Sequence, residues 1–437
     1  MTEQKAPRTR LEQVLRQRHL TLEEFRKNYN RTADADLSDR QAYRWVAGAV
    51  RGLPYPQAQA TLEKMFGEPV ERLFGPPYGA DALRRCLDGS TPGRGHARTD
   101  WEGQVITMSA DRARDFLSRI EASNVGAETL DQLADDVRRL VVDFQQQPLP
   151  TLLSDLVDIQ DRAFTLLEGR QRPEQSRDLY LLAGITCGLM ARASHDLGAS
   201  HDAMTQARTG YACADNAGHD GLRAWTRGLQ ALITYRSGQW EDSVRYAQSG
   251  AEAAARTRGT AAIWLASSEA RALGALNRLD DAFAALARAT EVRDRAEADE
   301  LDSLGGVCTF GRPRQLYYAA EALSWGGQPE ATRAEQVALE ALDAYATAPG
   351  RDRAFGGEAG TRSALALARV CQGQVDGAAE ALRPVLDLPA AQRIHGIIIS
   401  VEQVRSALSA IQNPGRDAIE LAGAIEGWTS ERLTQAR

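Results

Sequence analysis

From Ser109 to the C-terminus, apolar residues recur at intervals of three and four, the spacing that places them on one face of a helix. Almost no stretch alternates apolar and polar residues as a half-buried strand does. Residues 82–100 are rich in Gly, Pro, Ser and Thr and lack this periodicity, so we place a linker at residues 79–108. The pattern predicts an all-α protein with an N-terminal domain at residues 1–78 and a helical domain at residues 109–437.

The helical domain is self-similar. Six segments contain a polar break between two helical stretches, as in YRSGQWEDSVRYA and GALNRLDDAFAAL. Each second stretch has a small residue, and the first stretch has another small residue that lies twelve positions upstream of it. Small residues at both positions would let the two helices approach closely. The spacing predicts six helical hairpins stacked as an α-solenoid. The second-stretch residues are Ala203, Ser243, Ala282, Thr332, Ala378 and Ala418, and those upstream are Ala191, Ala231, Ala270, Ala320, Ala366 and Ser406.

In the N-terminal domain, the stretch DRQAYRWV predicts a short helix whose two faces differ in character. One face is apolar and centred on Trp45, and the other carries a row of basic and amide side chains, Arg40, Gln41 and Arg44. Arg and Gln pair bidentately with guanine and adenine edges, so the row predicts contacts with DNA bases. A solvated helix surface carries the same residue types, so this pattern alone leaves both interpretations open.

Charge is distributed unevenly along the 437 residues, which carry a net charge of −7. Residues 1–78 have 13 Lys and Arg against 10 Asp and Glu, whereas the rest has 39 against 49. Only the N-terminal domain would therefore be attracted to phosphate. No apolar run approaches the roughly 18 residues of a membrane span, and the first residues lack the apolar core of a signal peptide. We expect a cytoplasmic protein with no membrane partner.

Motifs that carry catalytic or metal chemistry are absent from the sequence. The five cysteines are far apart and form no C-x-x-C pair, and the six histidines form no H-E-x-x-H. Neither the phosphate-binding G-x-x-x-x-G-K-[ST] nor the nucleophile motif G-x-S-x-G occurs. We therefore expect no enzymatic activity, no metal and no cofactor.

Several strings resemble one family of proteins. LSDRQAYRWVAGAVRGLP and ATLEKMFGEPVERLFGPP resemble the helix-turn-helix of actinobacterial XRE-type transcriptional regulators, and SADRARDFL, LLEGRQRP, ASHDLG and ADNAGHDGLRAW are similar to further parts of the same group. These regulators have a tetratricopeptide-like C-terminal region, and some Streptomyces members control secondary metabolism or sporulation. The resemblance covers nearly the whole chain. It implies a regulator that binds double-stranded operator DNA and whose hairpins are long tetratricopeptide-like repeats.

A helix-turn-helix docks its second helix in the major groove, here the helix that Ser38 would cap. Two features depart from the family: NYNRTADADL would make an unusually long turn, and its aspartates would bring negative charge near phosphate. One such unit makes few base contacts, so we expect a homodimer. The resemblance implies base contacts by Arg40, Gln41 and Arg44, and backbone contacts by Thr21 and Arg51.

In tetratricopeptide-like repeats the first helix of each hairpin lines a concave groove. The residues predicted there combine aromatic and charged groups, which suits a peptide or an apolar small molecule with an acidic group. Aromatic residues at helical spacing also pack between repeats, and a scaffold that sequesters another regulator without binding DNA would have the same repeats. The predicted lining consists of Arg192, His195, Trp225, Tyr235, Trp264, Arg271, Arg314, Tyr317 and Glu321.

Overall fold

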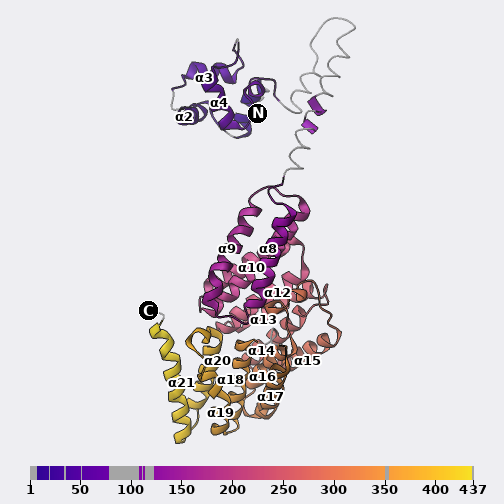
Figure 1. Cartoon of the computed structure of the whole chain (residues 1–437), viewed down its shortest axis with the longest axis vertical. Coiled ribbons are helices and arrows are strands. Elements are labelled where there is room, and N and C mark those ends of the chain that lie inside the picture. The colour runs from indigo at the N-terminus through magenta and orange to yellow at the C-terminus, as the bar shows by residue number, and fades with distance from the viewer. Residues whose placement is uncertain are drawn as a thin grey trace. The chain divides into compact units, whose positions relative to one another are not determined.

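The computed structural model divides into two compact units, Met1–Ala110 and Asp111–Arg437 (Figure 1). Every described element is a helix, which confirms the predicted all-α class. The predicted linker at residues 79–108 lies outside the described residues except for Met108. The structure describes residues 7–18, 20–33, 36–50, 52–77, 108–110, 112–113, 123–349 and 354–435.

Short helices build the described part of the N-terminal unit around one apolar core. Phe25, Trp45 and Leu62 are buried in this core, and the Trp45 ring lies edge-on to Tyr29 and Phe74, with ring centroids 5.5 and 6.2 Å apart. Aromatic pairs favour this edge-on geometry. The helices are α1 (Arg10–Gln17), α2 (Leu22–Ala33), α3 (Asp39–Val46), α4 (Pro56–Phe66) and α5 (Val70–Leu73).

Helix α2 is longer than the sequence predicted. It continues to Ala33 and includes the first six residues of NYNRTADADL, so the expected long turn is wrong and only residues 34–38 separate α2 from α3. Asn30 fixes the end of this turn. Its Oδ1 accepts a hydrogen bond from the Leu37 backbone N–H at 2.8 Å, and its Nδ2 donates to the Asp36 carboxylate at 2.7 Å. An Asn side chain that bonds nearby backbone is a common way to end a helix and begin a turn.

Most successive helices of the C-terminal unit pack against their sequence neighbours (Figure 1). The unit begins with α8 (Ala127–Asp143), α9 (Leu149–Leu167), α10 (Pro173–Asp196), α11 (Ser200–Ala217), α12 (Asp220–Arg236), α13 (Trp240–Ala254), α14 (Ala261–Ala275) and α15 (Leu279–Arg295). It continues with α16 (Arg312–Ser324), α17 (Ala331–Thr347), α18 (Phe355–Cys371), α19 (Val375–Leu386), α20 (His395–Ser409) and α21 (Arg416–Gln435). A single-turn 3₁₀ helix, η5 (Ala390–Gln392), precedes α20.

From α10 onward the helices form pairs: α10 with α11, α12 with α13, α14 with α15, α16 with α17, α18 with α19 and α20 with α21. Each turn within a pair contains a residue in the left-handed region, which Gly and Asn adopt most easily. These residues are Gly198, Gly238, Asn277, Gly327, Gly373 and Asn413.

The small residues that lie twelve positions apart in the sequence are found where the two helices of a pair approach each other. The Ser243 hydroxyl donates a 2.8 Å hydrogen bond to the Ala231 carbonyl across the α12–α13 pair, and both residues are buried. Two positions differ from the prediction. Thr332 is exposed and Ala331 is buried instead, because the 3₁₀ turn η3 (Gln328–Glu330) comes between α16 and α17 and shifts the register. Ser406 is also exposed, because α20 turns its apolar residues inward.

The segment between α15 and α16 folds inward rather than extending as a surface loop. It contains the 3₁₀ turns η1 (Asp302–Leu304) and η2 (Gly306–Cys308). Phe310 is buried and stacks on Trp264, with ring planes 16° apart. The Trp225 indole N–H donates to the Val307 carbonyl at 3.2 Å. These contacts hold the segment against α12 and α14.

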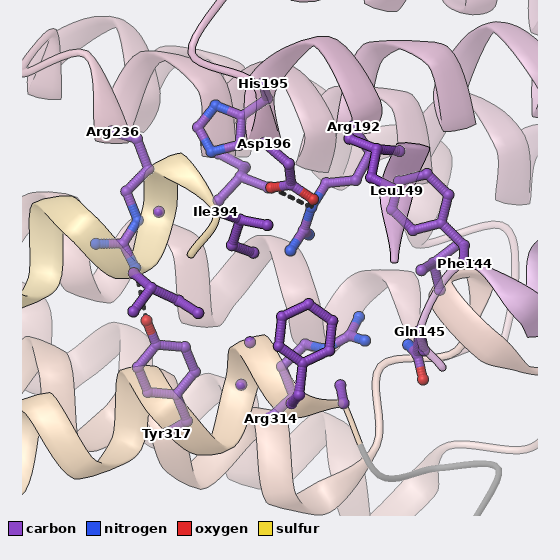
Figure 2. Close-up of a pocket in the computed structure, with 18 of the residues that line it drawn as sticks. Phe144, Gln145, Leu149, Arg192, His195, Asp196, Arg236, Arg314, Tyr317 and Ile394 are labelled. Atoms are coloured by element: carbon purple, nitrogen blue, oxygen red, sulfur yellow. Dashed lines mark hydrogen bonds and ion pairs between the residues drawn. The ribbon is translucent and has the colours of Figure 1, made fainter. Parts of the chain in front are cut away.

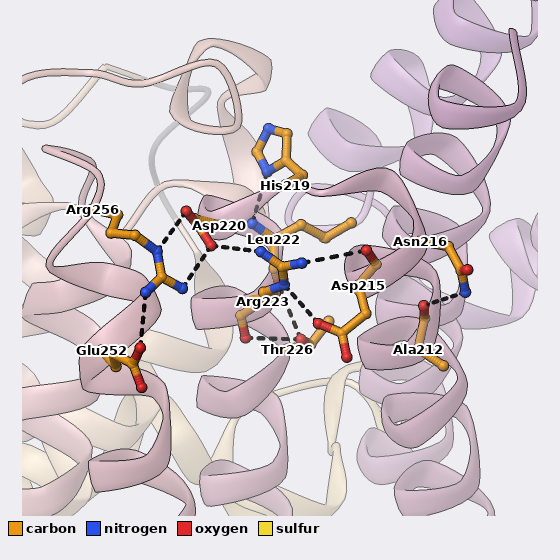
Figure 3. Close-up of polar contacts among 10 residues, drawn as sticks. All are labelled: Ala212, Asp215, Asn216, His219, Asp220, Leu222, Arg223, Thr226, Glu252 and Arg256. Carbon is orange, nitrogen blue, oxygen red and sulfur yellow. Dashed lines mark hydrogen bonds and ion pairs between the residues drawn. The ribbon is translucent and has the colours of Figure 1, made fainter. Parts of the chain in front are cut away.

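An ion-pair cluster joins the ends of α11, α12 and α13 (Figure 3). The Asp220 carboxylate, at the start of α12, accepts hydrogen bonds from Arg223 at 2.7 Å and from Arg256 at 2.8 and 3.0 Å. Arg223 also donates to Asp215 of α11 at 2.6 Å. His219 caps α12 by accepting from a backbone N–H. The cluster links two consecutive helix pairs through charged side chains.

Candidate functional site

The first candidate site is the outward surface of α3 in the N-terminal unit. The Ser38 side chain caps this helix by accepting from the Gln41 backbone N–H at 3.3 Å. Arg40 and Arg44 are exposed and Gln41 is half-buried, while Trp45 faces the core. The Arg44 Nε donates to the Ala49 carbonyl at 3.3 Å, which leaves the two terminal nitrogens of its guanidinium for other partners.

Acidic side chains near α3 have partners within the unit. The Asp39 carboxylate forms an ion pair with Arg26 Nε at 2.8 Å, and Asp36 bonds Asn30. Both contacts reduce the negative charge that the sequence placed near a phosphate backbone. Two tyrosines that were not among the predicted DNA contacts are exposed in this unit: Tyr43 on α3, 60% exposed, and Tyr55 at the start of α4, 70% exposed.

Thr21 and Arg51 are the residues that were predicted to contact the DNA backbone. The Thr21 hydroxyl donates to the Glu24 carboxylate at 2.8 Å and accepts from the Glu24 backbone N–H at 3.2 Å, so it caps α2. Its position at a helix N-terminus suits an approach by phosphate. Arg51 lies outside the described residues.

The second candidate site is a cavity of about 80 Å³ inside the C-terminal unit (Figure 2). The last turns of α10 and α12 lie on one side, with Arg192, His195 and Arg236. The first turns of α16, α18 and α20 contribute Arg314 and apolar side chains such as Ile394. Figure 2 shows Arg192 and Arg314 reaching toward the same space from opposite sides.

Contacts between helices far apart in sequence form the sides of this cavity. Helix α20 packs against α10, where the His195 and His395 rings meet edge-on with centroids 6.0 Å apart. The Arg236 guanidinium donates to the Ser400 hydroxyl of α20 at 3.2 Å and to the Tyr317 hydroxyl of α16 at 2.6 Å. The first helices of the pairs therefore contribute charged and polar side chains to this cavity.

Glu321 is the centre of the charged network behind the cavity. Its carboxylate forms ion pairs with Arg236 at 2.8 Å and with Arg271 at 3.1 Å, and all three side chains are buried. The Arg271 guanidinium also lies between two aromatic rings, 3.7 Å from the Tyr318 centroid and 4.3 Å from that of Tyr235. Cation–π contacts of this kind stabilise a desolvated guanidinium.

The remaining ionisable groups at the cavity differ in how they are paired. Arg192 Nε contacts both Asp196 carboxylate oxygens at 3.2 Å. Burial raises the pKa of Asp196, although the Arg192 charge opposes this effect. Burial also lowers the pKa of His195 well below its ordinary value, and the charges of Arg192 and Arg236 lower it further, so this imidazole is neutral. Burial lowers the pKa of Arg314, for which no carboxylate partner occurs among the described residues.

Four of the predicted groove residues, Arg192, Arg271, Arg314 and Tyr317, line the cavity together with His195. The others lie outside its lining. Trp225 and Trp264 pack between helices, each against a glycine of the preceding first helix, and Tyr235 accepts a hydrogen bond from Trp325 at 3.0 Å. Asp196 and Arg236 also line the cavity but were not predicted, because they directly follow His195 and Tyr235 and so fall one position beyond the predicted lining.

No protein-family model and no curated protein matches this chain significantly. Within the described ranges, no group of three His, Cys, Asp or Glu side chains could hold a metal ion. In the same part of the chain, no helix combines the length and apolar character needed to cross a bilayer.

Proposed function

We propose that this chain is a sequence-specific DNA-binding transcriptional regulator whose helical-repeat domain controls the N-terminal unit in response to a ligand. The observation that carries the proposal is the surface of α3. Its Arg40 and Arg44 side chains project outward from a helix that Trp45 and Ala42 fix to the core. A short rigid helix with exposed Arg and Gln side chains suits the major groove, where Arg pairs with guanine and Gln with adenine.

The order of helices supports a helix-turn-helix assignment. Helices α2 and α3 pack on each other across the short segment of residues 34–38, and α4 packs on α2 behind them. The cap by Thr21 leaves the start of α2 at the surface, where the first helix of such a motif meets the DNA backbone. The ion pair between Arg26 and Asp39 supports the same assignment because it offsets an acidic charge at the start of α3.

The six helix pairs support a tetratricopeptide-like array in the C-terminal unit. Such arrays bind ligands on the surface that their first helices form. A ligand changes DNA affinity only if it binds the DNA-competent and DNA-incompetent states with different affinities. We assign the C-terminal unit this sensor role in the cytoplasm, with regulation of secondary metabolism or development as the function that the family resemblance suggests.

A homodimer is part of the proposal. One helix-turn-helix makes too few base contacts for tight specific binding, and a symmetric pair would cover two half-sites about 10 base pairs apart or a multiple of that spacing. Light scattering should give twice the chain mass at concentrations where the protein occupies its DNA site. A monomer under those conditions would contradict this part.

Selection of duplexes from a random pool by the full-length protein tests the DNA proposal and requires no known target gene. We expect enrichment of one symmetric motif, and we expect its affinity to fall as salt rises because phosphate contacts release counterions. A pool that stays random after repeated selection would overturn the proposal and favour the alternative function, a repeat scaffold that sequesters another regulator.

A further inference from the structure

The charge around the cavity is unbalanced. Four guanidinium groups approach it, and the carboxylates that contact them within the described part of the chain are those of Asp196 and Glu321. Glu321 already pairs with two arginines and Asp196 pairs with a third, which leaves Arg314 without a carboxylate among the described residues. A partly desolvated cation without an anionic partner is costly, so a further negative charge beside Arg314 would be stabilising.

Backbone dipoles add to this positive potential. Helices α16, α18 and α20 all begin at the cavity, where their first turns contribute Arg314, Gly357 and Ile397 to its lining. Each helix N-terminus carries partial positive charge and backbone N–H groups without helical partners. Three such ends directed at one cavity, together with the arginines, favour an anion over a neutral ligand.

Some buried polar atoms at the cavity have no hydrogen-bond partner among the described residues. His195 is 2% exposed and its Nδ1 has no such partner, and Arg271 is fully buried with Nε and Nη2 that donate no hydrogen bond there. Buried polar groups are nearly always satisfied in native proteins, so each such atom calls for a partner. A bound ligand with acceptor and donor atoms would supply one.

Cavity size limits the ligand. About 80 Å³ holds a carboxylate-sized group but is far below the 300–1,000 Å³ of drug-sized sites. A second cavity of about 350 Å³ shares Gln145, Arg314 and Ala354 with the first and is bordered by Pro313 and Tyr345. The Tyr345 hydroxyl is another buried polar atom that forms no hydrogen bond within the described ranges. Both cavities border the Arg314 side chain, and together they would hold a small molecule with a charged end and a larger, partly apolar body.

We propose that the C-terminal unit binds a small organic carboxylate, with its charged group between Arg192 and Arg314 and its body in the neighbouring cavity beside Tyr345. Phe144, Leu149 and Ile394 provide apolar walls near the charged end. The small volume of this cavity suits one functional group better than an extended peptide. The proposal of a binding site does not depend on the proposed function, whereas the regulatory role of that site rests on it.

Calorimetric titration of the full-length protein tests the site with three probes: benzoate, its neutral analogue benzamide, and inorganic phosphate. Benzoate should bind, and benzamide should bind at least about tenfold more weakly because it lacks the charge. Phosphate should also bind more weakly because it has no apolar body. Absence of benzoate binding, or equal binding of benzamide, overturns the proposal. Phosphate binding as tight as that of benzoate overturns the assignment to an organic ligand.

Variants locate the site. Arg314→Met should weaken benzoate binding about 10- to 100-fold, the usual range for loss of a charged hydrogen bond. Arg208→Met, at an exposed residue of α11, is the matched control and should bind as the parent does.

Gly396→Leu is a second test that keeps every charge. Gly396 lines the cavity with open space around its Cα, so a leucine there should fill the cavity and weaken binding by a similar factor. Full affinity in both Arg314→Met and Gly396→Leu overturns the placement.

Thermal melting checks that lost binding is not lost folding. Without benzoate, Arg314→Met should melt no earlier than the parent, because it removes a half-buried charge that has no carboxylate partner in the described part of the chain. Benzoate should raise the melting temperature of the parent and leave that of Arg314→Met unchanged. A large drop in the melting temperature of Arg314→Met without benzoate would assign Arg314 a structural role and overturn the proposal. Benzoate binding that leaves affinity for selected DNA unchanged would overturn the regulatory role alone and leave the site standing.

Discussion

Arginines occur in two contrasting environments in this protein. On α3, Arg40 and Arg44 are exposed and keep most of their hydrogen-bond donors in water. Around the cavity of the C-terminal unit, Arg236 and Arg271 are buried and fixed by Glu321 and by tyrosines. An exposed guanidinium exchanges water for a base edge or a phosphate at small cost, whereas a buried one already depends on its anionic partner. The first environment suits a polyanionic macromolecule, and the second suits a small enclosed anion.

The same contrast applies to ion pairs. Glu321 holds two buried guanidinium groups within 3.1 Å, whereas Arg416 and Glu420 form a pair on α21 at 2.6 Å with both side chains mostly exposed. Distance alone would rank the exposed pair as the stronger. Burial reverses the ranking, because loss of one partner inside the protein leaves a charge that water cannot reach.

The largest expected effect comes from breaking the buried network. Glu321→Gln should destabilise the C-terminal unit by about 3–5 kcal/mol, because it leaves Arg236 and Arg271 without their shared negative charge. Glu420→Gln, the exposed control, should cost less than about 1 kcal/mol. Denaturant unfolding with hydrogen exchange resolved to α12, α14 and α16 measures both. Equal effects of the two substitutions would contradict the contrast between buried and exposed charges.

A smaller effect is expected at the exposed arginines, and it concerns DNA rather than stability. Arg44→Ala and Gln41→Ala should each weaken binding to the selected duplex by about 1–3 kcal/mol and relax sequence preference, because each removes a base contact. Lys64→Ala removes one exposed positive charge from α4 and should change specificity little. Fluorescence anisotropy on selected and scrambled duplexes measures the ratio of affinities. Unchanged ratios in both α3 variants would rule out α3 as the base-contacting helix.

The smallest expected effect is at the ion-pair cluster of α11, α12 and α13. Hydrogen bonds from Arg256 and Arg223 lower the pKa of Asp220 to about 2. A carboxyl group with a lowered pKa in the folded state stabilises the protein fully above its unfolded value of about 3.9, and this contribution is lost as the pH falls through about 2. Because Arg256 is half exposed, we expect Asp220→Asn to cost about 1 kcal/mol or less at pH 7. Unfolding experiments from pH 7 to pH 2 should show the parent and the variant converging, and a constant difference would contradict this role.

Local periodicity explains what could be predicted from the sequence. The all-α class followed from apolar spacing, and the inward position of Trp45 and outward position of Arg44 followed from the same rule applied to one short helix. The turns that contain Gly198 and Asn277 lie at the polar breaks of the predicted hairpins, because Gly and Asn adopt the left-handed conformation most easily.

The cavity could not be predicted in the same way. It depends on α20 meeting α10, a contact between segments about 200 residues apart that no local pattern contains. Arg236 was missed because it lies one position beyond the predicted lining, yet it reaches Tyr317 and Ser400 across the interior. Trp225 and Trp264 were predicted in the groove but lie between helices, where glycines leave room for their rings.

The most direct test of a DNA-binding regulator controlled by a buried anion site is reciprocal linkage. The affinity of the full-length protein for its selected duplex is measured with and without saturating benzoate, and the benzoate affinity with and without the duplex. We predict that both affinities change by the same factor, in the range of about 5- to 150-fold that couplings between sites usually show. Arg208→Met should respond as the parent does, and Arg314→Met should lose the response. Benzoate that binds tightly but leaves the DNA affinity unchanged would contradict the account.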